Sequence, residues 1–64
     1  MPKYLVTLLK EKAEGFYTDA ARVCIVQPTS YPGLLNYSYY VIYLQDEDLA
    51  YLKLKYEFVL IEKV

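Results

Sequence analysis

Apolar residues are concentrated in four short runs along the chain, and polar residues or proline separate these runs. The runs are rich in tyrosine and β-branched side chains, which favour extended strands. We therefore predict strands near residues 3–9, 22–27, 38–45 and 57–63. Pro28 is expected to end the second strand, because proline has no amide hydrogen to donate to a neighbouring strand.

The segment after the third strand shows the start signals of a helix. Asp46 is a preferred N-cap residue, and the acidic run at 46–48 suits the positive end of a helix dipole. Leu49 and Leu52 then recur at helical spacing, which predicts one helix near residues 46–56. From position 50 onward the same segment also alternates as a strand would, so a strand is the second interpretation.

Three other segments lack a clear period. Residues 10–15 are mostly charged and end at a glycine, which fits either a polar loop or the beginning of a short helix. Residues 16–21 are predicted to form a turn or a helical stub, and a second strand that begins at Phe16 is the alternative. Residues 28–38 contain two prolines, a glycine and several small polar residues, and they are predicted to form the longest loop.

Together these elements predict one α+β domain spanning residues 1–64, with a small sheet of about four strands and one helix. The same order would arise from a reduced ferredoxin-like β-α-β-β-α-β unit whose first helix has shrunk. That comparison rests on element order alone, and a shared fold does not define a function.

A chain of 64 residues has little room for a core. It buries only ~60% of the surface that its unfolded form exposes, so its stability is marginal without a supplement. Cys24 is the only cysteine, so no internal disulfide can form, and its apolar surroundings indicate a buried thiol. With no histidine, and with carboxylates at 46–48 that lack the spacing of a calcium loop, we expect neither a metal nor a cofactor. Oligomerisation is the supplement that remains.

An uncharged surface is the most informative feature, because every residue from 23 to 45 is uncharged. Strands that are apolar on both faces belong in sheets covered on both sides, and one helix covers only one side. Successive residues of the third strand are expected to point to opposite sides of the sheet. One side faces the helix, and the other side carries Tyr37, Tyr39, Val41 and Tyr43. This face is predicted to bind a second copy of the chain or a larger protein. Tyrosines exposed to water on a monomer are the alternative.

No arrangement typical of an enzyme is evident. The commonest general base, histidine, is absent, and the two glycines are isolated rather than part of a phosphate-binding loop. We therefore predict a non-enzymatic interaction protein that associates with itself through the tyrosine-rich surface. The alternative is a small single-stranded nucleic-acid-binding protein whose tyrosines stack on bases, which the net charge of −1 disfavours.

The expected location is the cytoplasm, with no contact with a membrane. No signal peptide is evident, and no apolar stretch approaches the roughly 18 residues of a membrane-spanning helix. A single unpaired cysteine also fits a reducing compartment. The absence of histidine and tryptophan, with most charges on Lys and Glu, resembles the composition of thermophile proteins. These patterns define neither the biological process nor the identity of a partner.

Overall fold

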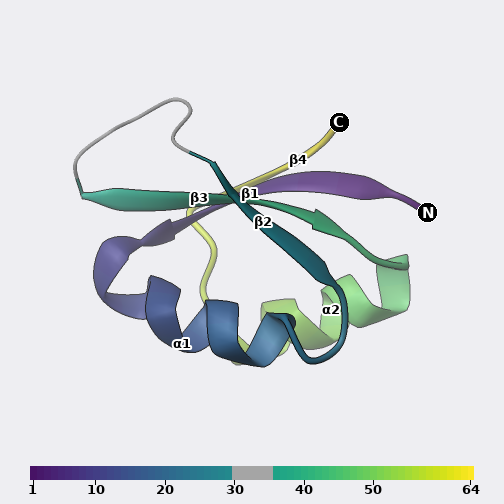
Figure 1. The fold of residues 1–64 in the computed structure, drawn as a ribbon, viewed down its shortest axis with the longest axis horizontal. Coiled ribbons are helices and arrows are strands. Elements are labelled where there is room, and N and C mark those ends of the chain that lie inside the picture. Colours follow the sequence, from purple (N-terminus) through teal and green to yellow (C-terminus); the bar gives the residue numbers. More distant parts are fainter. Residues whose placement is uncertain (30–35) are drawn as a thin grey trace.

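The chain folds as β-α-β-β-α-β in a computed structural model that describes residues 1–29 and 36–64. The elements are β1 (Lys3–Leu9), α1 (Lys10–Ala20), β2 (Ile25–Thr29), β3 (Tyr37–Tyr43), α2 (Asp46–Lys55) and β4 (Leu60–Lys63). The strands form one sheet in the order β2-β3-β1-β4, and each neighbouring pair is antiparallel. The predicted α+β class and four-stranded sheet are confirmed (Figure 1).

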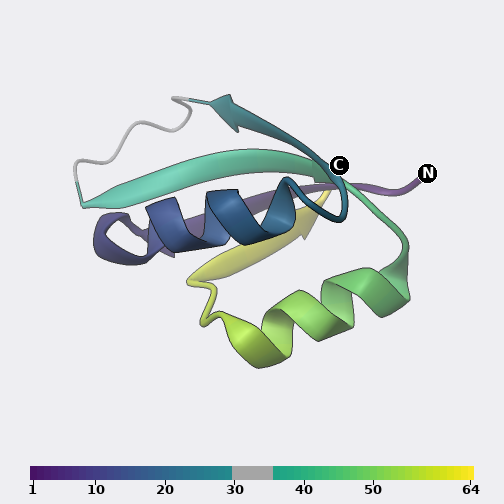
Figure 2. The same ribbon diagram turned by 60° about the horizontal axis from the view of Figure 1, so that its bottom comes forward.

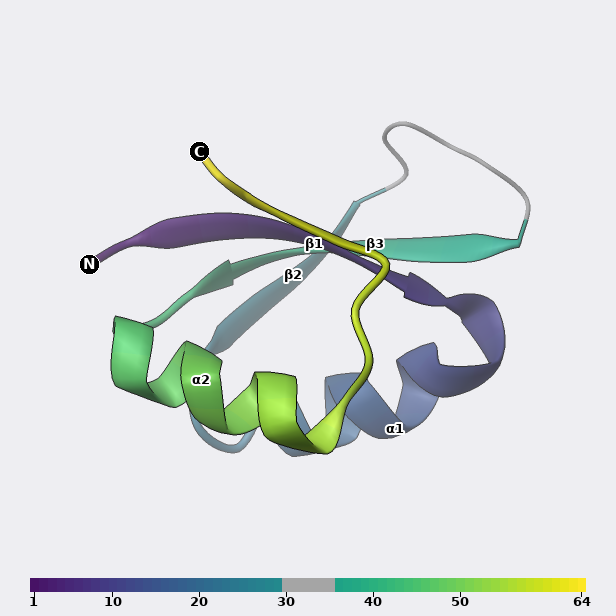
Figure 3. The same cartoon turned by 180° about the vertical axis from the view of Figure 1, so that it is seen from behind.

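The molecule has two layers, a sheet and a pair of helices that cover one of its faces. Figures 1 and 2 show α1 and α2 on the same side of the sheet, and Figure 3 shows this arrangement from behind. The core lies between the layers, and its largest fully buried side chains are Phe16, Leu8, Ile42, Leu44, Leu52 and Val6. Burial of one such side chain contributes ~1.5–3 kcal/mol, so this layer is the main apolar contribution to stability.

α1 is a complete helix of 11 residues, where the sequence predicted a loop or short helix followed by a turn or stub. Its buried residues are spaced three and four positions apart and are Ala13, Phe16 and Ala20. Two of the three are alanines, which have the highest helix propensity but give a weak hydrophobic signal. Gly15 does not end the helix, because a glycine at an exposed helical position costs only ~1 kcal/mol relative to alanine.

α2 confirms the helix predicted after the third strand and excludes the strand interpretation. Leu49 and Leu52 are its buried residues, as expected from their spacing. The expectation that Asp46 caps this helix is wrong, because the N-cap is Gln45, which makes no side-chain capping bond. Asp46 is the first helical residue, and its carboxylate accepts a hydrogen bond from the Tyr4 hydroxyl. This acid therefore links α2 to β1.

β2 is shifted along the chain relative to the strand predicted near 22–27. Residues 21–24 form the turn that follows α1, so the strand begins at Ile25. It also continues through Pro28, which pairs with Tyr40 and does not end the strand. The physical reason is the position of β2 at the edge of the sheet, where a proline can leave its missing amide hydrogen on the unpaired side.

β4 is shorter than the strand predicted over 57–63 and begins at Leu60. Phe58 instead turns into the core, where its ring packs edge-on against Phe16 with the ring centroids 5.4 Å apart. Within the loop predicted after the second strand, residues 30–35 lie outside the described part of the chain. That part of the loop prediction is therefore not addressed.

The position of β3 between β1 and β2 makes the first β-α-β unit a split one. β1 and β2 run parallel to each other, because both are antiparallel to β3. The element order is that of the ferredoxin-like unit. α1 is one residue longer than α2, so the first helix has not shrunk as the sequence suggested.

Polar contacts join the C-terminal ends of the two helices. The Lys55 Nζ atom lies 2.9 Å from Asp19 Oδ2, and the Tyr56 hydroxyl donates to the same carboxylate. The hydrogen bond from Tyr56, followed by the one from Lys55, holds the pKa of Asp19 below its ordinary value. The Tyr56 ring also packs edge-on against Phe16, with 5.6 Å between the ring centroids. These contacts form a junction that links the C-terminal ends of α1 and α2.

Candidate interaction surface

The face of the sheet turned away from the helices carries all four residues that the sequence singled out. Tyr37, Tyr39, Val41 and Tyr43 alternate along β3 with core residues such as Ile42. Successive strand residues point to opposite faces of a sheet. The four therefore lie on the face that neither α1 nor α2 covers, which is called the open face below.

The other strands extend the open face in rows, because paired residues of antiparallel strands point to the same side. Each row below runs in the order β2, β3, β1, β4. The first row contains Ile25, Tyr43, Lys3 and Val64. The second row contains Gln27, Val41, Leu5 and Glu62. The third row contains Thr29, Tyr39, Thr7 and Leu60. Tyr37 and Leu9 follow as a pair in the fourth row.

The accessible part of the open face lies toward its edges. Tyr39 is only 4% exposed and Thr7 only 7%, so the middle of the third row is already buried within the chain, and the first two rows are the accessible part of β3 and β1. Ile25 on β2 is 62% exposed and Leu60 on β4 is 50% exposed. The sequence prediction did not include these edge residues. Their apolar character is visible in the sequence, but only the strand order places both edges on the same face as β3.

Polar groups border the first two rows of the open face. Lys3 and Glu62 are the charged members of the three rows described above. The Lys3 Nζ atom lies 5.9 Å from the centroid of the Tyr43 ring, which places a cation over an aromatic face. The Tyr43 hydroxyl lies 3.4 Å from Gln27 Oε1. The half-buried Val41 lies between these groups, so the surface has an apolar middle with polar positions around it.

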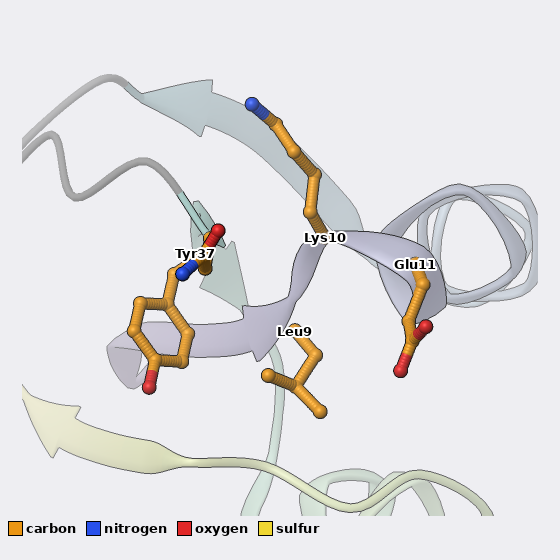
Figure 4. A pocket seen from close by; sticks show the side chains of 5 residues that line it. Leu9, Lys10, Glu11 and Tyr37 are labelled. Atoms are coloured by element: carbon orange, nitrogen blue, oxygen red, sulfur yellow. The ribbon is translucent and has the colours of Figure 1, made fainter.

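A hollow of 420 Å³ lies at one end of the open face, where β1 passes into α1. Its lining residues are Leu9, Lys10, Glu11, Asn36 and Tyr37. Figure 4 shows Leu9, Glu11 and Tyr37 extending to one side and Lys10 to the other. The Lys10 backbone N–H donates to the Asn36 carbonyl oxygen at 3.0 Å. The lining is mixed, with Leu9 and the Tyr37 ring as its apolar part, and the Lys10 side chain extends away from Glu11 (Figure 4).

Cys24 is the single cysteine of the chain, and its thiol is free and half-buried. Burial, and to a smaller extent the Asp48 carboxylate, raises the pKa of the Cys24 thiol, which makes the reactive thiolate scarce at neutral pH. The Cys24 Sγ atom instead donates to the Ala20 carbonyl oxygen at 3.3 Å. Within residues 1–29 and 36–64, no three His, Cys, Asp or Glu side chains are placed to hold a metal ion.

Neither helix in the described part of the chain has the length and apolar character needed to cross a membrane. Comparison of the chain with protein-family models, curated proteins and solved structures found no match.

Proposed function

We propose that this protein is a non-enzymatic interaction module that associates with a second copy of itself through the open face. The observation that supports this proposal most directly is the two-layer fold. Helices cover one side of the sheet, while the other side presents Ile25, Leu60 and the half-buried side chains of β3. Apolar strand surface of this kind is normally covered in a folded protein.

The size of the open face suits a partner with a sheet of the same size. The strands β1, β2, β3 and β4 have 7, 5, 7 and 4 residues, so at ~3.3 Å per residue and ~4.8 Å between strands they give a flat area of ~360 Å². Projecting side chains make the accessible area larger than this flat value. A standard interface buries ~800 Å² on each partner, so the open face alone would give a dimer interface at the small end of the observed sizes.

Marginal stability is a further argument for self-association. A domain of 64 residues buries only ~60% of its unfolded surface, and its stability is a small difference between large terms. Burial of apolar surface contributes ~25 cal/mol per Å², so the open face is the largest reserve of stabilisation that the sheet leaves unused. A second copy always presents a matching surface, because a two-fold interface is self-complementary.

Charge also favours a second copy. The three complete rows of the open face carry one cation, Lys3, and one anion, Glu62. The surface is therefore neutral as a whole. The chain has a net charge of −1, so two copies repel each other only weakly.

Single-stranded nucleic acid is the second candidate for the same face. Tyr37 and Tyr43 place aromatic rings on a central strand, and Lys3 lies beside the second ring. Bases stack on such rings in several small sheet proteins. Against this function, Glu62 lies in the row next to Lys3, and the net charge of −1 gives little attraction for a phosphate backbone. Self-association is the better supported proposal.

A cytoplasmic location is part of the same proposal. Cys24 is the only cysteine and is a free, half-buried thiol. A free thiol persists most readily in a reducing compartment. The same reducing compartment would suit this thiol whatever the partner of the protein is.

The test is sedimentation equilibrium of the wild type and of Val41→Glu over a range of micromolar concentrations. We expect the wild type to form a dimer of the 7.5 kDa chain and Val41→Glu to be a monomer, because an unpaired buried carboxylate costs several kcal/mol. Ile25→Glu provides a second variant, since the 62% exposed side chain of Ile25 makes misfolding of the monomer an unsatisfactory explanation.

The matched control is Leu54→Glu, which adds the same charge at an exposed position of α2. This variant should dimerise like the wild type, since α2 lies on the opposite side of the sheet from the open face. A wild-type mass of one chain at every concentration, with no change in melting for either open-face variant, contradicts the proposal. Dimerisation that only Leu54→Glu abolishes would place the interface on the helices instead.

A further inference from the structure

The rows of the open face restrict how two copies can pack. When two identical sheets pack face to face, the two-fold axis lies in the plane of the interface, because each copy presents the same face to the other. When the strands of the two copies are aligned, the axis runs either parallel to the strands or across them. These two arrangements place different residues opposite one another, so the chemistry of each row distinguishes between them.

Consider first an axis that runs parallel to the strands, between β1 and β3. Each row then lies over the same row of the second copy, with the order of the strands reversed. β3 of one copy then lies over β1 of the other, and β2 lies over β4. Aligned sheets of this kind pack about 10 Å apart, with their strands at roughly 30° to each other. The helices stay on the outside, and the dimer has four layers.

In the two accessible rows, side chains of matching character meet in this arrangement. In the first row, Ile25 lies over Val64 of the second copy, and Tyr43 lies over Lys3, which already contacts a tyrosine ring within its own chain. In the second row, Val41 lies over Leu5. In the same row, the side-chain amide of Gln27 lies over the carboxylate of Glu62 of the second copy. Each charge of the face therefore meets a polar or aromatic group.

An axis across the strands gives a poorer match. Each strand then lies over its own copy with the order of rows reversed, and the second row meets the third. Glu62 lies over Leu60 and Lys3 lies over Leu9 in that case. Both charges would be buried against leucine without a partner, which is strongly unfavourable.

We propose that the dimer has its two-fold axis parallel to the strands, with Gln27 of each copy opposite Glu62 of the other. This inference rests on the proposed self-association and deepens it by assigning the register of the interface. The pair is suitable for a charge test. Within one chain β2 and β4 are the two edges of the sheet, three strand spacings or ~14 Å apart. That separation exceeds the Debye length of ~8 Å at physiological salt, so coupling within one chain is weak.

The experiment measures the dimer dissociation constant by sedimentation equilibrium at 0.15 M ionic strength. Gln27→Glu places like charges opposite each other at two symmetry-related positions, and we expect the dimer to weaken about tenfold. Adding Glu62→Lys to that variant converts the repulsion into attraction and should restore wild-type affinity or better. Gln45→Glu is the matched control, because it makes the same change on the helix side of the molecule, and it should leave the affinity unchanged.

Two results overturn the arrangement, and they are distinguishable. If Gln27→Glu has no effect, or if Glu62→Lys fails to rescue it, while Val41→Glu still dissociates the dimer, the register is wrong and self-association through the open face stands. If the wild type is a monomer at all concentrations, both the register and the proposed function are wrong.

Discussion

Leu52 and Leu54 lie two positions apart on α2, and their surroundings are opposite. Leu52 is 1% exposed and belongs to the core, whereas Leu54 is 91% exposed. The side chains are chemically identical, so any difference between them in a stability measurement comes from burial alone. At the scale of single residues, this pair provides the cleanest test of where the core lies.

We expect Leu52→Ala to lower the free energy of unfolding by roughly 2–5 kcal/mol, because the substitution removes buried methyl groups and leaves a cavity. Leu54→Ala serves as the control and should change the free energy by less than about 0.5 kcal/mol, as exposed substitutions usually do. Urea unfolding followed by circular dichroism measures both. Similar losses at the two positions would be incompatible with the observed packing of α2.

At the scale of elements, the junction between α1 and α2 depends on pH. The hydrogen bond from Tyr56 and then that from Lys55 lower the pKa of Asp19 below its ordinary value. A carboxyl group whose pKa is lower in the folded state stabilises the fold above its unfolded pKa of about 3.9. That stabilisation is lost as the pH falls through the folded pKa, so the junction weakens in acid.

We expect Asp19→Asn to reduce the acid sensitivity of the fold. The urea midpoint of the wild type should fall between pH 7 and pH 3, and the variant should fall less, because it no longer contributes this linkage. Tyr56→Phe removes the first cause of the pKa shift but keeps Lys55, so its acid dependence should be intermediate. If Asp19→Asn loses as much stability in acid as the wild type, the junction does not contribute to the pH dependence.

At the scale of the whole molecule, the two sides of the sheet differ in what they can bind. The helix side is closed by the core, and the open face is neutral, with Lys3 and Glu62 in adjacent rows. A neutral surface on a chain of net charge −1 cannot release many counterions from a nucleic acid. Aromatic stacking alone then has to supply the affinity.

We therefore expect no binding tighter than about 100 μM to a single-stranded oligonucleotide or to duplex DNA at physiological salt. Tyrosine fluorescence is the measurement, because a base that stacks on Tyr37 or Tyr43 quenches the emission. The Val41→Glu variant is a useful comparison, since it changes the same face. Quenching at micromolar oligonucleotide, with a steep dependence on salt, would favour nucleic acid over a second copy of the chain.

Local patterns in the sequence determined the elements whose signals lie within a few residues. The alternation of residues along β3 assigned Tyr37 and Val41 to one face and Ile42 to the other, since side chains in a strand have a period of two. The acids before Leu49 and the spacing of Leu49 and Leu52 indicated α2. Such signals need no knowledge of distant parts of the chain.

Only the tertiary structure decided the features that join distant segments. Pairing across the sheet placed Ile25 and Leu60 on the same face as the outward side chains of β3. Asp46 was expected to cap α2, but its carboxylate accepts a hydrogen bond from the hydroxyl of Tyr4, which is 42 positions away in the chain. The buried side of α1 contains two alanines and Phe16, and this pattern is too weakly hydrophobic to predict a helix from the sequence. The packing of Phe16 in the core shows which side of the helix is buried. These outcomes depend on which surfaces meet, and a local period cannot encode that.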